Sequence, residues 1–339
     1  MQVPLALAAF ALLASIPAAA NTAKAVGVQI ITPLAPERGT TLDVTLWYPA
    51  ASGGTPVLMG DTPIFKGEPA QRGAPVAPES FPLVLLAHGG LRAAPHLGDW
   101  IAARLAAGGY VVVVPHQAGP ATEQDIWLRP ADLSAVLTAV ENDPVLATHI
   151  DGTRVGVLGV LRGGTSALAL VGARLDAERY AHSCDEGELG LDCAWFKKTN
   201  VDLHGLDAAR VGRTNRDPRI KVAIAVDPEL STFFTPASLA GIPVPVEIIN
   251  LGQSATVAPG LYASSLASAI PHARYETVPD ATVFGAFSEC KPSGPAILRD
   301  DGDDDAICID RANRTRAEIH AQLAAMIGAA LRLHLQTAP

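Results

Sequence analysis

Short apolar segments constrain the fold of this chain more than any other feature. Runs of apolar or alternating residues, each of strand length, recur along the sequence and alternate with segments of helical periodicity. The expected strands are 26–32, 41–48, 83–87, 110–114, 155–158, 222–226, 244–249 and 275–278. The expected helices are 97–107, 130–141 with its proline at the start, 165–173, 261–269 and 314–335. This alternation predicts an α/β fold with a mostly parallel, doubly wound sheet, in which the leading strands could pair antiparallel at one edge.

One segment interrupts the alternation. Residues 181–218 contain a pair of cysteines and show no strand pattern, so we predict a small cap or lid over the carboxyl ends of the strands, where α/β folds bind ligands. Residues 50–80 are rich in glycine, proline and alanine and are expected to form a loop. Without a repeat or a linker to divide the chain, residues 21–339 are expected to form a single domain.

The N-terminal segment predicts export. An apolar run over residues 3–20 ends in three alanines, a small-residue pattern typical of a cleavage site, so residues 1–20 are expected to be a signal peptide. Because no lysine or arginine precedes the run, an uncleaved anchor helix is the alternative. Later apolar runs are shorter, so no membrane span is expected after cleavage. The sequence therefore predicts a periplasmic or secreted protein.

The four cysteines agree with export, because disulfides persist in oxidising compartments. Four cysteines allow three pairings, and we favour the local one, Cys184–Cys193 with Cys290–Cys308, because each pair lies close in a polar stretch. Zinc is the competing interpretation, but CxxC-type spacing is missing. The acidic run 300–305 does not fit a calcium-binding EF-hand loop. We therefore expect no metal site and no cofactor.

Composition excludes two broad classes. The chain has 339 residues, of which 49% are hydrophobic and 17% charged, the reverse of a disordered protein. It carries 34 acidic and 25 basic residues, a formal net charge of −9. A nucleic-acid-binding protein usually shows a basic surface, so we expect no nucleic-acid partner.

A glycine turn follows the expected strand 155–158. The segment reads Gly159-Val160-Leu161-Arg162-Gly163-Gly164 and leads into a helix, which is the setting of a nucleophile elbow, G-x-S-x-G. The flanking glycines suit this tight turn. The position between them should carry a hydroxyl or thiol, but it is Leu161, which has no lone pair with which to attack. A dinucleotide-binding motif fits less well, because the glycine spacing differs.

Further motifs surround this turn. They are Trp47-Tyr48-Pro49, Leu86-Ala87-His88-Gly89, Arg129-Pro130-Ala131-Asp132-Leu133, Ile150-Asp151, Phe234-Thr235-Pro236 with Leu239, and Asp310-Arg311 with His320. Together they resemble the secreted dienelactone-hydrolase-like proteins of the α/β-hydrolase superfamily, akin to platelet-activating-factor acetylhydrolases. The resemblance covers roughly residues 25–335 and implies an α/β-hydrolase fold. In such relatives the elbow reads G-H-S-x-G-G, so both the histidine and the serine are replaced here.

The resemblance also implies where the other catalytic groups would lie. The histidine would follow the last strand, where Val283 stands in this chain. The acid has two candidate positions. One is Asp227, directly after the strand 222–226, and the other is occupied by Ala255.

The resemblance further implies an oxyanion hole made of backbone N–H groups. Arg162 would supply one of them, and Gly90 or Leu91 the other. His116 follows a strand and could line the pocket.

The sequence thus predicts a pseudoenzyme. Because Leu161 and Val283 are both apolar, the Ser-Asp-His triad is not intact and the chain is expected to lack hydrolase activity. Its vestigial pocket could still bind a small hydrophobic or ester-like ligand. The alternative is a serine ester hydrolase, similar to a carboxylesterase, lipase or acetylhydrolase, that uses a displaced catalytic set.

Overall fold

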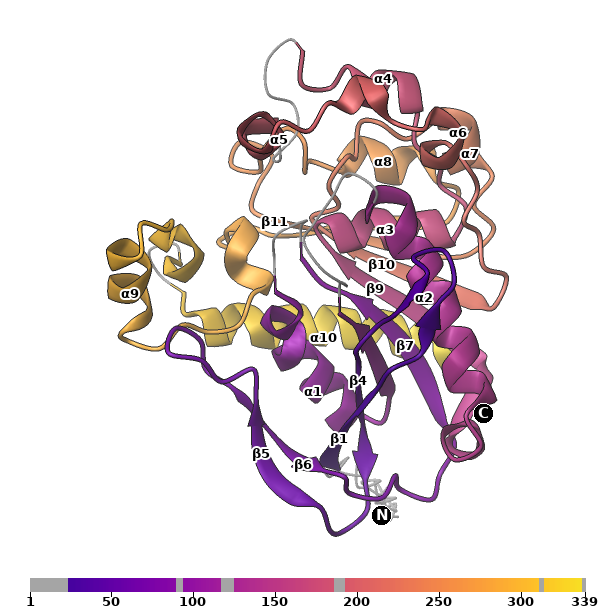
Figure 1. Cartoon of the computed structure of the whole chain (residues 1–339), viewed down its shortest axis with the longest axis vertical. Helices are drawn as coiled ribbons and strands as arrows, with labels where there is room; N and C mark the ends of the chain where they lie inside the picture. Colours follow the sequence, from indigo (N-terminus) through magenta and orange to yellow (C-terminus); the bar gives the residue numbers. More distant parts are fainter. Residues whose placement is uncertain (1–23, 90–93, 117–124, 186–192, 311–313, 337–339) are drawn as a thin grey trace, which may run out of the picture.

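A twisted β-sheet runs through the centre of the molecule (Figure 1). The computed structural model describes residues 24–89, 94–116, 125–185, 193–310 and 314–336. The strands are β1 (Ala25–Ile31), β2 (Leu34–Ala35), β3 (Thr40–Thr41), β4 (Val44–Ala50), β5 (Thr55–Met59), β6 (Glu68–Arg72), β7 (Phe81–Ala87), β8 (Val111–Pro115), β9 (Ile150–Val160), β10 (Ile220–Val226), β11 (Val246–Leu251) and β12 (Ala273–Val278).

The main sheet has ten strands within the described residues, in the order β12-β11-β10-β9-β7-β8-β4-β1-β6-β5. The strands from β12 to β8 pair parallel, whereas β4 is antiparallel to both β8 and β1. The chain passes from β7 to β8 on one side and returns to place β9 on the other. The strand order therefore reverses beside β7, and ligands of open α/β sheets bind at such a point.

Helices cover both faces of the sheet. The α-helices are α1 (Asp99–Ala107), α2 (Asp125–Asn142), α3 (Arg162–Leu170), α4 (Ala177–Ala181), α5 (Cys193–Thr199), α6 (Ala208–Val211), α7 (Pro236–Ala240), α8 (Ser264–Ala269), α9 (Gly294–Asp300) and α10 (Arg316–Leu335). Short 3₁₀ helices are η1 (Pro95–Gly98), η2 (Leu146–His149), η3 (Leu203–Gly205), η4 (Val283–Ala286) and η5 (Asp305–Cys308). Helices α1 and α10 pack on one face, and α2, α3 and α8 on the other.

The alternation of side chains along a strand produces these two cores. In β7, Leu83 and Leu85 belong to the core under α2 and α3, whereas Val84 and Leu86 belong to the core under α1 and α10. All four side chains are fully buried. A strand that is buried on both faces has a continuous apolar sequence. The strands of this sheet could therefore be predicted from their apolar runs. The predicted mostly parallel, doubly wound sheet is confirmed.

Two expectations about local structure were wrong. Residues 50–80 do not form only a loop, because they contain the strands β5 and β6, of which β5 is an edge strand of the sheet. These strands are half-exposed and contain prolines, so they lack the apolar run of a buried strand. Helix α2 begins at Asp125, and Pro130 therefore lies inside the helix rather than at its start. The prediction placed the start at the proline because proline favours the first helical turn.

The segment 181–218 leaves the sheet and lies at the top of Figure 1. It contains α5, η3 and α6, which are joined by loops. Phe196, Leu203 and Val211 bury their side chains in the core under α2 and α3, so the segment packs against the domain. Its role as a lid stays a prediction.

Both predicted disulfides are confirmed. Cys184 bonds to Cys193 and Cys290 to Cys308, with sequence separations of 9 and 18 residues. These bonds fit a secreted or periplasmic protein. The predicted signal peptide, residues 1–20, lies outside the described residues.

The two bonds allow a matched test of stability. Replacing Cys290 and Cys308 by serine should lower the free energy of unfolding by about 3 kcal/mol, because the unfolded chain regains the entropy of an open loop. The Cys184–Cys193 bond closes a loop of half the length, so the same change there should lower the free energy of unfolding by about 0.6 kcal/mol less. Urea unfolding of the two double variants measures both values. An equal or reversed ranking would contradict loop entropy as the cause.

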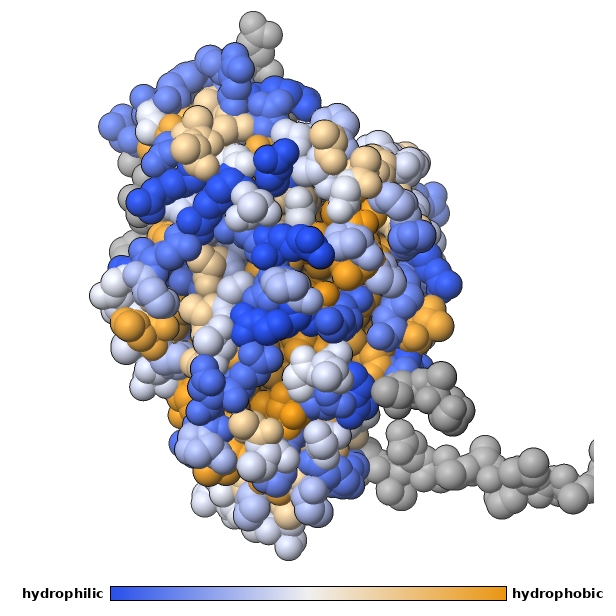
Figure 2. Space-filling view, turned by 90° about the vertical axis from the view of Figure 1, so that its right-hand side faces the viewer, coloured by the Kyte–Doolittle hydropathy of each residue, from blue (hydrophilic) through white to orange (hydrophobic). Residues whose placement is uncertain are grey.

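The surface carries no large uniform patch on the face shown in Figure 2. Hydrophilic residues cover most of this face, and hydrophobic residues show between them. Among the described residues, no helix combines the length and the apolar character needed to cross a membrane.

Candidate active site

The turn between β9 and α3 has the geometry of an elbow. Leu161 adopts φ 55° and ψ −121° at the N-cap of α3, a backbone conformation that residues other than glycine rarely adopt. Its N–H donates to the Val226 carbonyl at 2.9 Å, and its own carbonyl accepts from Gly164 N–H at 2.8 Å. The side chain is 5% exposed. The strained turn is therefore present although a leucine stands at its tip.

The two flanking glycines are required by packing. A Cβ on Gly159 would lie 2.0 Å from the carbonyl oxygen of Gly163, and a Cβ on Gly163 would lie 1.8 Å from the carbonyl oxygen of Ala87. Both neighbours are backbone atoms, which cannot rotate away as a side chain can. The close contact between elbow and strand therefore excludes any larger residue.

Asp227 lies beside Leu161 at the carboxyl edge of the sheet. Val160 of β9 pairs with Val226 of β10, and each is followed directly by one of these two residues. Adjacent strands lie about 4.8 Å apart, so Leu161 and Asp227 are neighbours. Asp227 also has a positive φ, 43°, and its N–H donates to the Ile249 carbonyl at 2.8 Å. A second strained residue thus stands next to the elbow.

The carboxyl group of Asp227 is fully buried, and only one of its two oxygens accepts hydrogen bonds from the described residues. Its Oδ1 accepts from Asn250 Nδ2 at 2.7 Å and from the Leu251 N–H at 2.9 Å. Its Oδ2 is buried and accepts no hydrogen bond from the described residues. Burial raises the pKa of Asp227 to about 7, against the opposing effect of these two donors. A carboxyl group that exchanges its proton near neutral pH can act as a general base.

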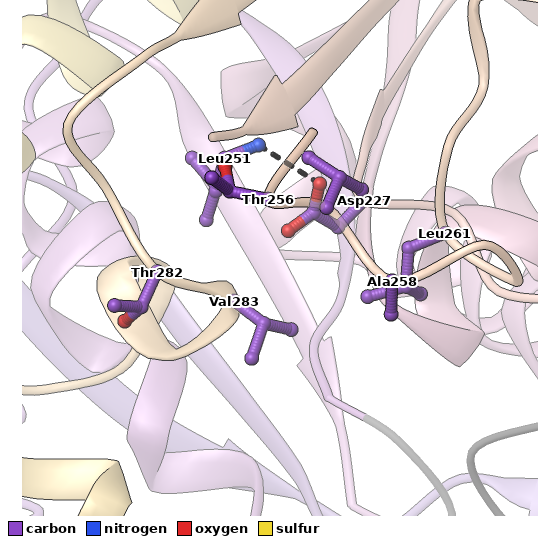
Figure 3. Close-up of a pocket in the computed structure, with 8 residues that line it drawn as sticks. Asp227, Leu251, Thr256, Ala258, Leu261, Thr282 and Val283 are labelled. Atoms are coloured by element: carbon purple, nitrogen blue, oxygen red, sulfur yellow. Dashed lines mark hydrogen bonds between the residues drawn. The ribbon is translucent and has the colours of Figure 1, made fainter. Parts of the chain in front are cut away.

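A small cavity of about 160 Å³ borders this carboxyl group. It is lined by Asp227, Leu251, Thr256, Val257, Ala258, Leu261, Thr282 and Val283. Figure 3 shows Asp227 and Val283 on opposite sides, with a carboxylate oxygen directed into the space between them. The structure thus places Asp227 and Val283 at one cavity, and Asp227 also lies next to Leu161, which is not among the lining residues.

Buried histidines brace the loop that carries Val283. His88 Nε2 and Trp100 Nε1 donate to the Ala286 carbonyl at 3.0 and 2.7 Å, and His320 Nε2 donates to the Phe287 carbonyl at 2.9 Å. Burial lowers the pKa of His88 to about 4 and that of His320 to about 3, so both rings stay neutral. Neither histidine lines the cavity. Their hydrogen bonds hold the backbone of this loop in place.

The other predicted site residues lie elsewhere or outside the described residues. Ala255 is exposed and does not line the cavity, so the carboxyl group here is that of Asp227. His116 follows β8, bonds to Thr45 Oγ1 at 2.8 Å and does not line the cavity either. Gly90 and Leu91 lie outside the described residues.

Arg162 is the first residue of α3, so its backbone N–H belongs to the turn next to Leu161. Its side chain forms a buried ion pair with Glu229, with 2.9 Å between Nε and Oε2. The guanidinium group is therefore paired with Glu229 in the interior. Whether the backbone N–H serves an oxyanion hole stays a prediction.

A second cavity, of about 260 Å³, lies at the amino ends of the strands, opposite the ends that carry the elbow. Its lining includes Ile220 at the start of β10 and Val244 just before β11. The amino ends of parallel strands meet there, away from the elbow and from Asp227. The smaller cavity is therefore the candidate active site.

The strand order and the elbow define this chain as an α/β-hydrolase fold. No protein-family model and no curated protein sequence matches it. A ferulic acid esterase from Streptomyces cinnamoneus has a similar solved structure, with a TM-score of 0.61, 20% identity, and coverage of 96% of this chain and 93% of that chain. A dienelactone hydrolase from Anabaena variabilis has a TM-score of 0.50, 13% identity, and coverage of 91% and 98% respectively.

These comparisons correct the prediction that the chain lacks hydrolase activity. The solved proteins that share its architecture over more than nine-tenths of its length are an esterase and a dienelactone hydrolase. The prediction was wrong because it rested on two apolar positions, Leu161 and Val283. It considered Asp227 only as a possible triad acid and took no account of its burial and raised pKa, which exist only in the folded protein.

Proposed function

We propose that the protein is an exported carboxylic ester hydrolase that uses a displaced catalytic set, in which Asp227 activates water. The observation that carries the proposal is the unpaired, buried Oδ2 of Asp227 at the cavity beside the elbow. An acid that in a triad would orient a histidine faces Val283 here, and a valine leaves its oxygen without a partner. A water molecule is small enough to enter the cavity and donate a hydrogen bond to this oxygen.

The reaction needs no nucleophilic side chain. The Asp227 carboxylate takes a proton from a water molecule in the cavity, and the resulting hydroxide adds to the ester carbonyl carbon. The tetrahedral intermediate then breaks its bond to the leaving alkoxide, which takes the proton back from the Asp227 carboxyl group. The N-terminus of α3 and the Arg162 N–H would stabilise the negative oxygen of the intermediate.

The cavity supports a small substrate. Its volume of about 160 Å³ holds a water molecule and a short acyl group, and is too small for a long chain. Apolar side chains such as Leu251 and Leu261 form most of its wall. We therefore propose esters with short, uncharged acyl groups as substrates.

Changing Asp227 to asparagine tests the proposal. The variant keeps a group that can accept from Asn250 and Leu251 but cannot take a proton, so hydrolysis of p-nitrophenyl acetate at pH 8 should fall roughly 100-fold, toward the buffer rate. In the wild type the rate should rise with pH and level off above about 7, because the carboxylate is the active form. A pH–rate profile of both proteins measures this.

Asp99 provides the matched control. It is also buried, its pKa is also raised to about 7, and it lies in α1 away from the cavity. Asp99→Asn should therefore leave the rate and its pH profile unchanged. A wild-type rate equal to buffer, or equal rates for the wild type and Asp227→Asn, would contradict the proposed function.

Unfolding measurements check that Asp227→Asn folds. The pKa of Asp227 is about 7 in the folded protein and near 3.8 when exposed, so the folded state binds this proton more tightly. The wild type therefore gains stability from this group as pH falls from 7 toward 4, and carries a buried charge at pH 8. The asparagine variant avoids that charge and should be no less stable than the wild type at pH 8.

A further inference from the structure

Two histidines and an aspartate meet on the surface of the 181–218 segment. His182 Nδ1 lies 2.7 Å and His204 Nε2 lies 3.1 Å from the carboxylate oxygens of Asp185. The potential ligand atoms of the three residues all lie within 4.8 Å of one another. This is the only such group of three or more among the described residues.

We propose that His182, Asp185 and His204 bind a divalent transition-metal ion. Two imidazoles and a carboxylate suit Zn²⁺, Cu²⁺ or Ni²⁺, whereas Ca²⁺ and Mg²⁺ prefer oxygen ligands alone. The nearby Cys184 is bonded to Cys193 and cannot act as a thiolate ligand. The proposed site has three protein ligands and lies on the surface, so water would complete a tetrahedral shell.

The distances from each imidazole to Asp185 suit a bound ion. Zinc bonds of about 2.0–2.1 Å in a tetrahedral shell place neighbouring ligand atoms roughly 3.3 Å apart. The two nitrogen–oxygen distances here are 2.7 and 3.1 Å, already close to that spacing. The two imidazole nitrogens lie within 4.8 Å of each other, so ion binding would bring the imidazoles to the same spacing. The ion would replace the protons that now lie between the imidazoles and Asp185.

A second carboxylate orients one of the ligands. Asp202 Oδ1 lies 3.0 Å from His204 Nδ1, so this nitrogen donates to Asp202 and leaves Nε2 to face Asp185. A carboxylate that holds the outer nitrogen of a metal-binding histidine is a common feature of zinc sites.

The ligands come from separate parts of the segment. His182 and Asp185 follow α4 and flank Cys184, whereas His204 lies in η3. Bound metal would therefore tie the end of α4 to η3 beside the Cys184–Cys193 disulfide. The sequence predicted no metal site because it lacks CxxC-type spacing and an EF-hand loop. Asp185 and His204 are 19 residues apart, and only folding brings them together.

Zinc binding tests the proposal. Protein treated with EDTA and then dialysed should bind about one Zn²⁺ per chain in isothermal titration calorimetry, with a rise in melting temperature on adding ZnCl₂. His182→Gln and His204→Gln should each weaken binding at least tenfold and abolish the rise in melting temperature. Asp202→Asn should weaken binding about tenfold through loss of the orienting carboxylate.

An exposed histidine elsewhere gives the control. His272 lies between α8 and β12, outside the cluster, so His272→Gln should bind zinc as the wild type does. The ligand side chains lie at the surface, and circular dichroism of the metal-free variants should match that of the wild type. Lack of saturable binding by the wild type, or equal binding by the wild type, His182→Gln and His204→Gln, would overturn the proposal.

Discussion

Replacing Leu161 by serine and Val283 by histidine should raise the hydrolysis of short p-nitrophenyl esters by roughly 1,000-fold or more over the wild type. The elbow already has the required backbone, with φ 55° and ψ −121° at residue 161. Asp227 faces Val283 across the cavity with an unpaired oxygen, which could accept the Nδ1–H of an imidazole placed there. The double variant would thus complete a triad within an existing frame.

Each single change should do far less. Leu161→Ser alone has no histidine to pass its proton to, and Val283→His alone has no serine to activate, so the full gain depends on both changes. A fluorophosphonate probe should label the double variant in one-to-one ratio and leave the wild type unlabelled, because only an activated serine reacts. Adding Asp227→Asn to the double variant should remove most of the gain.

The double variant tests the assignment of the nucleophile and histidine positions. A folded double variant that neither reacts with the probe nor hydrolyses esters faster than the wild type would contradict the assignment of Leu161 and Val283 to the nucleophile and histidine positions. It would leave the proposed role of Asp227 in the wild type untouched, because that role is measured in a different protein and with a different variant.

Changing Gly163 to alanine should destabilise the protein by more than about 4 kcal/mol, or prevent folding. The added Cβ would lie 1.8 Å from the carbonyl oxygen of Ala87, and that oxygen belongs to the central strand β7. Relief would require moving the elbow away from the sheet, which would also disrupt the buried helix α3 behind it. Urea unfolding, or the yield of soluble protein where unfolding cannot be followed, measures the loss.

Gly205→Ala is the matched control for this prediction. Gly205 ends η3 at the surface, its φ is not positive, and a Cβ there would meet no atom within 4 Å. The change should therefore shift stability by less than about 1 kcal/mol. Equal losses for the two variants would show that the contact with Ala87 does not limit the choice of residue at position 163.

Much of the fold could be predicted because buried parallel strands leave a strong pattern. Strands such as β8, β10 and β11 are buried on both faces and mostly apolar, and each expected run overlaps the observed strand. The outer strands β5 and β6 were missed because a half-exposed strand with prolines has no such pattern. The pairing of cysteines was predictable because a short separation in sequence makes the bond between neighbours the easiest to form.

The candidate site was predicted in part. The glycine turn identified the elbow and its Leu161, because that geometry demands small residues at fixed positions. The sequence left two positions for the acid, and the fold favours Asp227, since Ala255 is exposed while Asp227 lies beside the elbow. The His182, Asp185 and His204 cluster escaped detection because its members share no motif.

The sequence by itself determined the buried strands, most helices, the elbow and the disulfides, because each depends on residues that are near one another along the chain. Only the tertiary structure decided the chemistry of Asp227. Its carboxyl group resembles any other in the sequence, and its pKa rises to about 7 because β9, β10 and β11 remove it from water. A property that arises from burial depends on groups distant in sequence, so it exists only once the chain has folded.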